Sequence, residues 1–481
     1  MTQGLNFRRH GLYIVATLSL GACAVGPDYR QPPDVDIGAG WSQSVQTTEA
    51  QLEMAQWWCS LDDPVLDRLV TDALSSNLNL RQAYARIHEA RALRDRAAGG
   101  YAPVVNTSGS VSRRRQSENG PLPIASIPGL DRDQTIYDIG FDAAWEIDLF
   151  GKTSRTLERA EASLQAAQAD AMDIRISVAA EVARTYLTLR GAQRELAARE
   201  SSVETLQQTL DLVQKRFELG DASQAEVDTT EARLAAAEAA LPTIQARLRA
   251  AALGLGVLLG MPPEHELVLI HTDVPEITLR ALPVGARADV LRRRPDIRAA
   301  ERRLAASTAD IGVATAELFP KLSIAAGGGF QSLNSGNLFE SDSSRFSIVP
   351  LISWRLFDGG RVRAEIRATE ARQQQAALAY EQAVLTALSD AERALSDYLY
   401  GLDAVKRQQL ALKAARLSYG HAQTRFDVGD IALTDLFTEE RVLRDAEENY
   451  VRTHTATAIN LVALFKALGG GWDVGATDSQ Q

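Results

Sequence analysis

The sequence predicts an α+β fold in which one unit, composed of a helix, two strands, a very long helix and a shorter helix, occurs twice. Three observations predict it. Short motifs recur at a constant spacing, two pairs of segments alternate between apolar and polar residues, and long stretches place apolar residues every three or four positions. The two halves of the chain are therefore expected to share one architecture.

The duplication is clearest in two motifs. "WEIDLFGK" (145–152) recurs as "WRLFDGGR" (354–361), and "RFELGDAS" recurs as "RFDVGDIA", in both cases 209 residues later. Upstream, "YAPVV" aligns with "LFPKL" at a spacing of 217. Trp, Gly and Phe aligned at a spacing of 209, and Pro aligned at 217, indicate one duplicated unit with a change in length between Pro103 and Trp145. The first repeat lies at about 64–260 and the second at about 289–468.

A very long helix is predicted in each repeat. In the first, apolar residues recur in steps of three and four from Leu157, as in a coiled coil. No proline falls between Gly151 and Gly220, so this helix could extend about 100 Å at roughly 1.5 Å per residue. Segments 64–98 and 222–258 are predicted as the shorter helices of the unit.

Four strands are predicted by period-two alternation, at about 103–113, 135–149, 320–331 and 344–357. A soluble sandwich would also alternate, but runs of about ten residues with acids on one face and an aromatic residue near the end favour an outer-membrane barrel. The glycines of "AAGGGF" (325–330) are expected to relieve crowding within a strand. Because the smallest membrane barrels have about eight strands, one chain cannot close a barrel; two chains give the minimal eight, and three give twelve.

The N-terminus has the pattern of a bacterial lipoprotein signal. Arg8 and Arg9 precede an apolar run that is too short to span a membrane, and the run ends in Leu20-Gly21-Ala22-Cys23. This tetrapeptide resembles a lipobox, in which the cysteine is acylated, although an incidental cysteine is the alternative. Since Ala24 and not an aspartate follows, we expect an outer-membrane lipoprotein.

Composition limits the other classes of function. The formal net charge of −11 argues against nucleic acid as a partner. Cys23 and Cys59 are the only cysteines, so neither a disulfide framework nor a thiol metal cluster is expected. No motif pairs a nucleophile with a base. The sequence therefore predicts no enzyme activity, no metal and no cofactor beyond the covalent lipid on Cys23.

Several segments together resemble one known family. These are "VGPDY" after the lipobox, "WWCSLDDPVLDRLV", "RRRPDIRAAERRLAASTADIGVATAELFPKLSI", and the paired "RFELGD" and "RFDVGD". They are similar to the TolC-like outer-membrane efflux lipoproteins of the NodT subgroup, from Cys23 to about Trp472. The resemblance implies a homotrimer with a twelve-stranded membrane β-barrel, continued by a long periplasmic α-helical barrel with an equatorial region around the helices.

The resemblance also implies a function. Such proteins are passive exit ducts of tripartite efflux systems for drugs or other toxic small molecules. An inner-membrane pump, here expected to be of the RND type, delivers the cargo through a periplasmic adaptor (membrane fusion protein). The alternatives are the exit duct of a type I protein-secretion system and, in a different class, a non-channel structural lipoprotein of the envelope.

Two glycine turns are predicted to form the tips farthest from the membrane. Gly220 and Gly429 each follow a long helix, where a glycine in the left-handed conformation reverses the chain. In the family these tips contact the adaptor. Around them, we expect exposed or half-exposed side chains at Arg216, Phe217, Arg425 and Phe426.

Acidic residues after the second tip line the periplasmic entrance of the pore in the family. Asp435 matches the first of these positions, and a ring of such acids selects or binds cations. The second position is Thr438, so Glu439 would have to substitute there. Glu226 matches an acid that helps to latch the closed pore, but its usual basic partner falls at Ile431. The latch is therefore expected to differ, with Arg425 as a candidate partner. A solvated acid in a first helical turn is the alternative for Asp435.

The remaining segments complete the expected domain organisation. They are a lipoprotein signal peptide at 1–22, an acylated extended arm at 23–63, an equatorial connector at 261–288 and a C-terminal tail at 469–481.

Overall fold

The computed structural model describes residues 24–32, 38, 40–43, 54–117, 131–272, 277–280 and 287–471. Cys23, the signal peptide and most of the C-terminal tail lie outside these ranges. The chain divides into two compact units, one containing the sheet and the other most of the helical residues. None of the described helices carries an apolar stretch long enough to cross a membrane.

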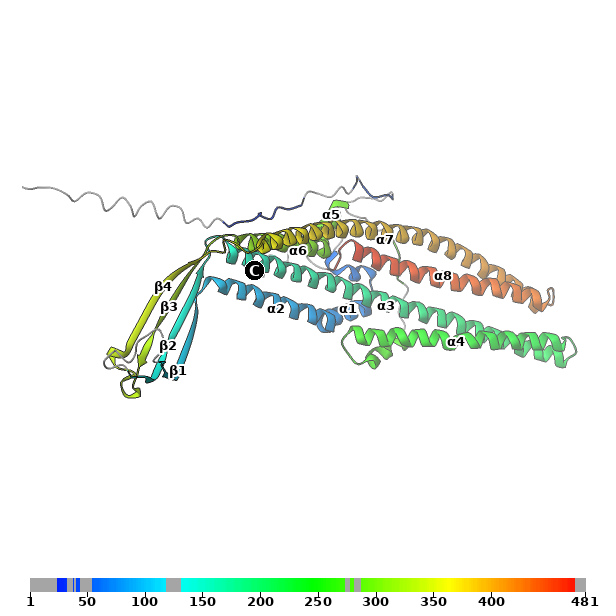
Figure 1. Cartoon of the computed structure of the whole chain (residues 1–481). Coiled ribbons are helices and arrows are strands. Elements are labelled where there is room, and N and C mark those ends of the chain that lie inside the picture. Colours follow the sequence, from blue (N-terminus) through cyan, green and yellow to red (C-terminus); the bar gives the residue numbers. More distant parts are fainter. Residues whose placement is uncertain are drawn as a thin grey trace, which may run out of the picture. The chain divides into compact units, whose positions relative to one another are not determined.

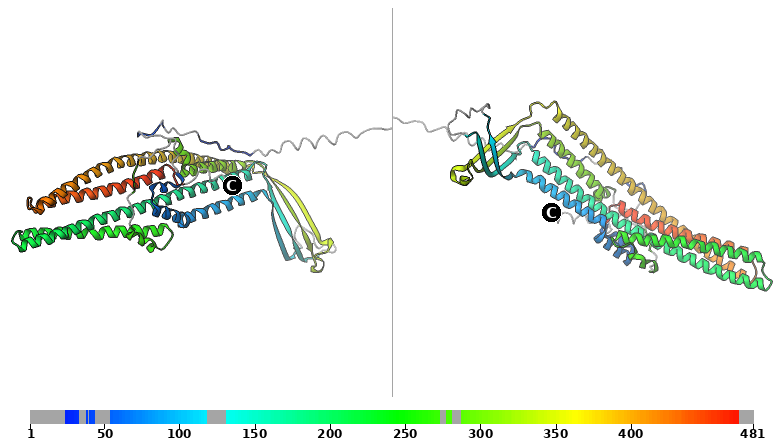
Figure 2. Two further views of the ribbon diagram at one scale, coloured as in Figure 1. Left: turned by 180° about the vertical axis from the view of Figure 1, so that it is seen from behind. Right: turned by 60° about the horizontal axis from the view of Figure 1, so that its bottom comes forward.

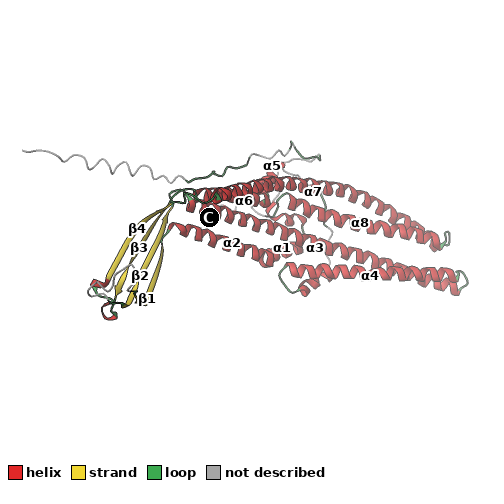
Figure 3. Ribbon diagram, in the orientation of Figure 1, coloured by secondary structure: helices red, strands yellow, loops and turns green. Residues whose placement is uncertain are grey.

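Most of the described chain is helical, and all four strands gather in one sheet (Figure 3). The α-helices are α1 (Pro64–Ser76), α2 (Leu78–Ala98), α3 (Lys152–Glu218), α4 (Gln224–Leu258), α5 (Arg287–Arg293), α6 (Pro295–Ala316), α7 (Arg361–Asp427) and α8 (Leu433–Ala467). Helices α3 and α7 have 67 residues each, and α4 and α8 have 35 each. Equal lengths at equivalent positions are what an internal duplication predicts.

The sheet is antiparallel, with the strand order β1-β2-β3-β4 (Figure 1). Its strands are β1 (Val104–Arg115), β2 (Asp133–Ile147), β3 (Lys321–Ser332) and β4 (Ser344–Ser353). The expectation about the "AAGGGF" glycines is confirmed, because a Cβ on Gly329 would lie 2.2 Å from the carbonyl oxygen of Ile139. The backbones of β2 and β3 therefore approach too closely for a side chain at this position.

The prediction for the end of β4 was wrong, because the strand ends at Ser353 and not at 357. Ser353 pairs with Lys321, the first residue of β3, so no partner remains beyond it. The next residue, Trp354, instead donates its indole Nε1–H to the carbonyl oxygen of Leu318 at 3.0 Å. Trp145 makes the equivalent bond to Tyr101 in the first repeat.

The helix predicted at 64–98 is broken in two. Asn77 lies between α1 and α2, and its side-chain oxygen accepts hydrogen bonds from the backbone of Asn79 and Leu80. Its amide also donates to the carbonyl oxygen of Leu258 at 2.7 Å. An asparagine that caps the following helix competes with helix continuation, which explains the break.

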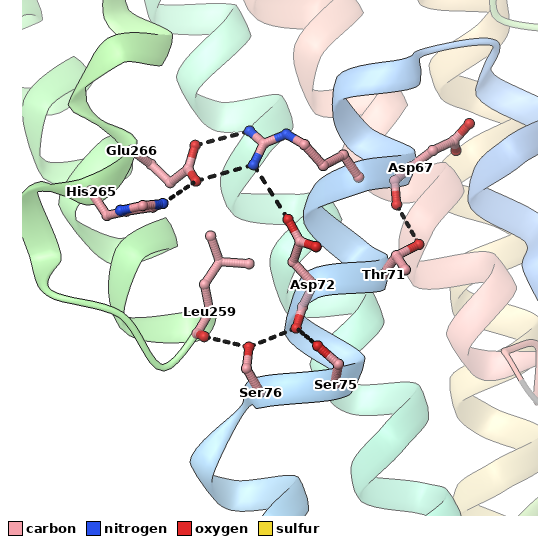
Figure 4. Close-up of polar contacts among 9 residues, drawn as sticks. Asp67, Thr71, Asp72, Ser75, Ser76, Leu259, His265 and Glu266 are labelled. Atoms are coloured by element: carbon pink, nitrogen blue, oxygen red, sulfur yellow. Dashed lines mark hydrogen bonds and ion pairs between the residues drawn. The ribbon is translucent and has the colours of Figure 1, made fainter.

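A short 3-10 helix, η4 (Pro263–His271), follows α4 and is tied to α1. Glu266 on η4 is 2 % exposed and binds the guanidinium of Arg68 at 3.1 Å. Nearby, Ser76 donates to the carbonyl oxygen of Leu259 at 2.6 Å (Figure 4). Because a buried carboxylate needs a charged partner, this ion pair fixes the position of η4 against α1.

The segment after Cys23 is docked in the sheet-containing unit. Val25 donates its N–H to the carbonyl oxygen of Phe150, and Arg155 at the start of α3 binds the carbonyl oxygen of Val25 and the carboxylate of Asp28. Arg155 is 4 % exposed. A Cβ on Gly26 would lie 2.5 Å from the Cα of Gly312 on α6. The docked segment therefore joins the start of α3 to α6.

Candidate functional site

The C-terminal ends of the two long helices, α3 and α7, form matching tips. Helix α4 runs alongside the C-terminal part of α3, and α8 alongside that of α7, in each view (Figure 2). Gly220 and Gly429 have φ values of +85° and +76°, which confirms the predicted left-handed turns. Nothing lies within 4 Å of a Cβ built on either residue, so the backbone conformation alone requires glycine.

Hydrogen bonds close both tips in the same way. Asp221 donates its N–H to the carbonyl oxygen of Arg216 at 2.8 Å, and Asp430 donates to that of Arg425 at 2.8 Å. This pattern satisfies helix-terminal carbonyl groups and ends the helix at a left-handed glycine. The repeated "RF-x-x-GD" motif is therefore a helix stop that folds identically in both repeats.

An apolar cluster joins the two tips within the helical unit. It contains side chains from α3, α4, α7 and α8: Leu206, Leu210, Val213, Val227, Leu234, Ala237, Ala422, Phe426, Leu433, Leu436 and Phe437. Phe426 is 4 % exposed, so the prediction of an exposed or half-exposed side chain was wrong. Its repeat equivalent Phe217 is 42 % exposed, as predicted. The second tip buries its phenylalanine because the first hairpin packs on it.

The basic residues of the tips have local partners. The guanidinium carbon of Arg216, which is partly exposed, lies 5.4 Å from the ring centre of Phe426. Arg425 is exposed, as predicted, and binds Asp430 at 2.7 Å. Arg425 therefore closes its own turn in this chain, and its contact is with Asp430 and not with Glu226.

The predicted gate residues have different surroundings. Glu226 forms a capping box with Ser223 at the start of α4, and the backbone N–H of Ser223 lowers the pKa of its carboxyl group. Asp435 is exposed in the first turn of α8. Thr438 is exposed and donates to the carbonyl oxygen of Thr434, while Glu439 accepts a hydrogen bond from Ser418 on α7 at 2.7 Å.

One buried acid beside these residues was not singled out from the sequence. Glu440 is 8 % exposed, and its Oε1 has no hydrogen-bond partner within the described part of the chain. Burial raises the pKa of its carboxyl group, and the charges of Arg444 and Arg233 oppose that rise. Its spacing after Leu433 and Phe437 places it on the apolar face of α8, a signal that was present in the sequence.

The described chain thus combines two long antiparallel helix pairs that end in glycine turns with one antiparallel four-stranded sheet. The chain belongs to the outer membrane efflux protein family, whose model matches residues 69–261 and 287–470. These matched segments correspond to the two repeats of the fold. Proteins of this family are channel-like efflux ducts.

Known proteins similar to this chain agree with that family. It is 30% identical to the "Toluene efflux pump outer membrane protein TtgF" of Pseudomonas putida over 97% of this chain and 98% of the relative. It is 29% identical to "Nodulation protein T" of Rhizobium leguminosarum bv. trifolii over 95% and 96%. The solved structure of the outer-membrane channel OprN is 37% identical, with a TM-score of 0.84 over 94% of this chain and 100% of that one. The chain is accordingly an outer-membrane exit duct of an efflux system.

Proposed function

We propose that three copies of this chain assemble into one channel with a twelve-stranded membrane β-barrel and a periplasmic α-helical barrel. The observation that carries this proposal is the open sheet. Within the described residues, β1 and β4 each pair with only one other strand, so this part of the chain presents two unpaired sheet edges. Phe346, Ile348 and Ile352 on β4 are 87 %, 70 % and 71 % exposed. A lipid environment and a neighbouring strand would cover these groups.

Disulfide cross-linking tests the assembly. In a Cys59→Ser background, we would introduce one cysteine at Asn106 on β1 and scan a second one along 346–352 on β4. The expected result is an oxidant-dependent ladder that ends at three chains, because β1 of one copy pairs with β4 of the next. Ala143→Cys on β2 is the matched control, since β2 already has two neighbours. No ladder at any register in membrane-inserted protein would contradict the assembly.

The proposed cargo is a small toxic or drug-like molecule, delivered by an inner-membrane RND-type pump through a periplasmic adaptor. The relative TtgF, whose name refers to toluene efflux, supports a small-molecule cargo. The tips are the proposed docking surface for the adaptor. Exposed apolar side chains at each turn support this docking proposal. Phe217, Leu219 and Val428 are 42 %, 78 % and 76 % exposed.

Photocrosslinking tests the adaptor contact. A photoreactive amino acid at Leu219 or Val428 is expected to cross-link to an adaptor subunit in cells, identified by mass spectrometry. The control position is Leu410 on α7, which is 69 % exposed but lies outside the tips. Equal cross-linking from Leu410 and the two tip positions would contradict adaptor docking at the tips.

We further propose that Cys23 carries the lipid and anchors the chain in the outer membrane, with no other cofactor. Several acyl chains suffice for stable anchoring, because each buried CH₂ contributes about 0.8 kcal/mol. The docked segment 24–30 supports this proposal, since it fixes the chain immediately after Cys23. Radiolabelled palmitate should label the wild type and not Cys23→Ser; labelling of both would place the lipid elsewhere.

A further inference from the structure

An ion pair crosses the sheet from β4 to β2. Arg345 on β4 donates to the carboxylate of Asp138 on β2 through two nitrogens, Nε at 3.1 Å and Nη2 at 2.6 Å. Gln331 on β3, the strand between them, donates to the same carboxylate at 2.7 Å. Both oxygens of Asp138 are therefore engaged by a bidentate guanidinium, the geometry that fixes a charged pair most strictly.

Glycines leave the path of Arg345 across β3 free. Arg345 pairs with Gly329, and Gly329 pairs with Gly140, so the three residues lie in one row across the strands. Because neighbouring strands are about 4.8 Å apart, Arg345 extends across roughly two strand spacings to reach β2. A Cβ on Gly140 would lie 3.4 Å from Nη2 of Arg345. Side chains in this row would therefore obstruct the guanidinium.

The ion pair shares one face of the sheet with a second acid. Side chains two residues apart in a strand point to the same face, so Asp142 accompanies Asp138 and Ser347 accompanies Arg345. Gly327 lies between Asp142 and Ser347 in the register. A Cβ on Gly327 would lie 3.0 Å from Oδ1 of Asp142 and 3.7 Å from Oγ of Ser347, which places both side chains on this face.

Arg345 balances part of the negative charge of this face. Asp142 is exposed and makes no hydrogen bond or ion pair among the described residues. Two further bases lie on the same face nearer the strand ends, Arg114 on β1 and Lys321 on β3, and Lys321 is itself ion-paired. Without Arg345, two neighbouring carboxylates of β2, those of Asp138 and Asp142, would therefore both be unbalanced.

We propose that Arg345 determines the charge selectivity of the outer half of the channel, by balancing Asp138. The inference rests on the proposed assembly, in which the polar face of each sheet lines the lumen and the apolar face meets lipid. The pair lies in the half of β2 away from α3, and so away from the periplasmic helices. Three copies repeat the pair around the lumen, so small cationic cargo leaves past neutral pairs and not past three additional acids that would retain it.

The test measures the local potential from the reaction rates of an engineered cysteine. In a Cys59→Ser background, Ser347→Cys in isolated outer membranes is treated with a cationic and with an anionic methanethiosulfonate reagent. Arg345→Gln should raise the cation-to-anion rate ratio about threefold or more at about 10 mM salt, since the reagents differ by two charges and the lost charge lies on the order of 10 Å away. At about 1 M salt the Debye length is about 3 Å, so the change should disappear.

Three further variants separate charge from structure. Arg345→Lys keeps the charge and should keep a ratio close to that of the wild type. Asp138→Asn combined with Arg345→Gln removes both charges and should restore the wild-type ratio, which a purely structural role of the pair would not produce. Arg372→Gln is the matched control, because it removes an exposed arginine on α7, outside the sheet, and should leave the ratio unchanged.

Ile348→Cys tests the orientation of the sheet, because Ile348 is 70 % exposed on the opposite face from Ser347. Reagents that cannot cross a membrane should label Ser347→Cys and not Ile348→Cys. Equal labelling of both would contradict the proposed assembly and this inference with it. Selective labelling of Ser347→Cys, with a ratio that Arg345→Gln leaves unchanged or that the double variant does not restore, would overturn the role of Arg345 alone.

Discussion

Glu226 and Asp435 occupy the third position of α4 and α8, 209 residues apart, but only Glu226 caps its helix. Ser223 supplies the hydroxyl and backbone N–H that Glu226 needs, whereas Ala432 precedes α8 without a side-chain cap. Within the described residues, the Asp435 carboxylate makes no ion pair and no hydrogen bond. The two repeats thus contain one acid that caps its helix and one acid that does not.

We predict that Glu226→Ala lowers the stability of the first turn of α4 by about 1 kcal/mol, because the capping box is lost. Asp435→Ala should change the stability of α8 by less than about 0.5 kcal/mol. Hydrogen exchange of the two helix starts measures both. Since the pKa of Glu226 is lowered in the folded state, its contribution is present above its ordinary value of 4.5 and is lost as pH falls through the lowered value. Equal effects of the two substitutions would contradict this assignment.

The repeat-equivalent phenylalanines provide a second prediction. Phe426→Ala should destabilise the tips by about 3–5 kcal/mol, because it leaves a cavity in the shared apolar cluster. Phe217→Ala, at 42 % exposure, should cost less than about 1 kcal/mol. Free energies of local opening from hydrogen exchange of both hairpins compare them. A smaller loss for Phe426→Ala than for Phe217→Ala would show that the cluster does not hold the hairpins together.

We predict that the contribution of Glu440 to the stability of α8 depends on pH with the opposite sign to the contribution of Glu226. Its pKa is raised by burial, so the stability it contributes is present at low pH and is lost as pH rises from its ordinary value of 4.5 through the raised one. Protection factors for residues 433–444 should therefore fall over this range, after correction for intrinsic exchange. Glu440→Gln should abolish the change. Glu439→Gln serves as control and should retain it; a pH dependence that survives Glu440→Gln would assign it to another group.

Docking of the segment after Cys23 provides a fourth prediction. Gly26→Ala should release this segment, because the new Cβ would lie 2.5 Å from the Cα of Gly312 and Gly26 has a φ of +89°. The measurement is the rate of proteolysis between residues 24 and 32, which should rise. Gly40→Ala is the control, because nothing lies within 4 Å of its Cβ. An unchanged rate in Gly26→Ala would mean that the close packing against α6 is not required for docking.

Local signals in the sequence predicted much of the fold. The absence of proline and the heptad spacing predicted a helix between Gly151 and Gly220, which is α3 (Lys152–Glu218). The spacing of 209 predicted that Gly220 and Gly429 would adopt the same conformation. These features depend on backbone geometry and on contacts between residues close in sequence, so a local pattern contains them.

The environment of individual side chains was harder to predict. Phe426 was expected to resemble Phe217, but burial depends on which hairpin packs on it, and a repeat does not specify that. Arg190 resembles any solvated arginine on a long helix, yet residues 269–272 cover it from a segment about eighty residues later. Equivalent positions in a duplicated chain can therefore acquire different roles through contacts between distant segments.

The most direct test of the exit duct is planar-bilayer conductance of the purified mature protein, comparing the wild type with Asp435→Ala. We expect small, cation-selective openings from the wild type, because three copies of Asp435 would form an acidic ring at the entrance. The substitution should enlarge the openings or reduce their cation selectivity. Conductance of Glu226→Gln, measured in parallel, shows whether the helix-capping acid also affects the openings. Absence of current from both proteins, in samples confirmed as trimeric and inserted, would contradict the account.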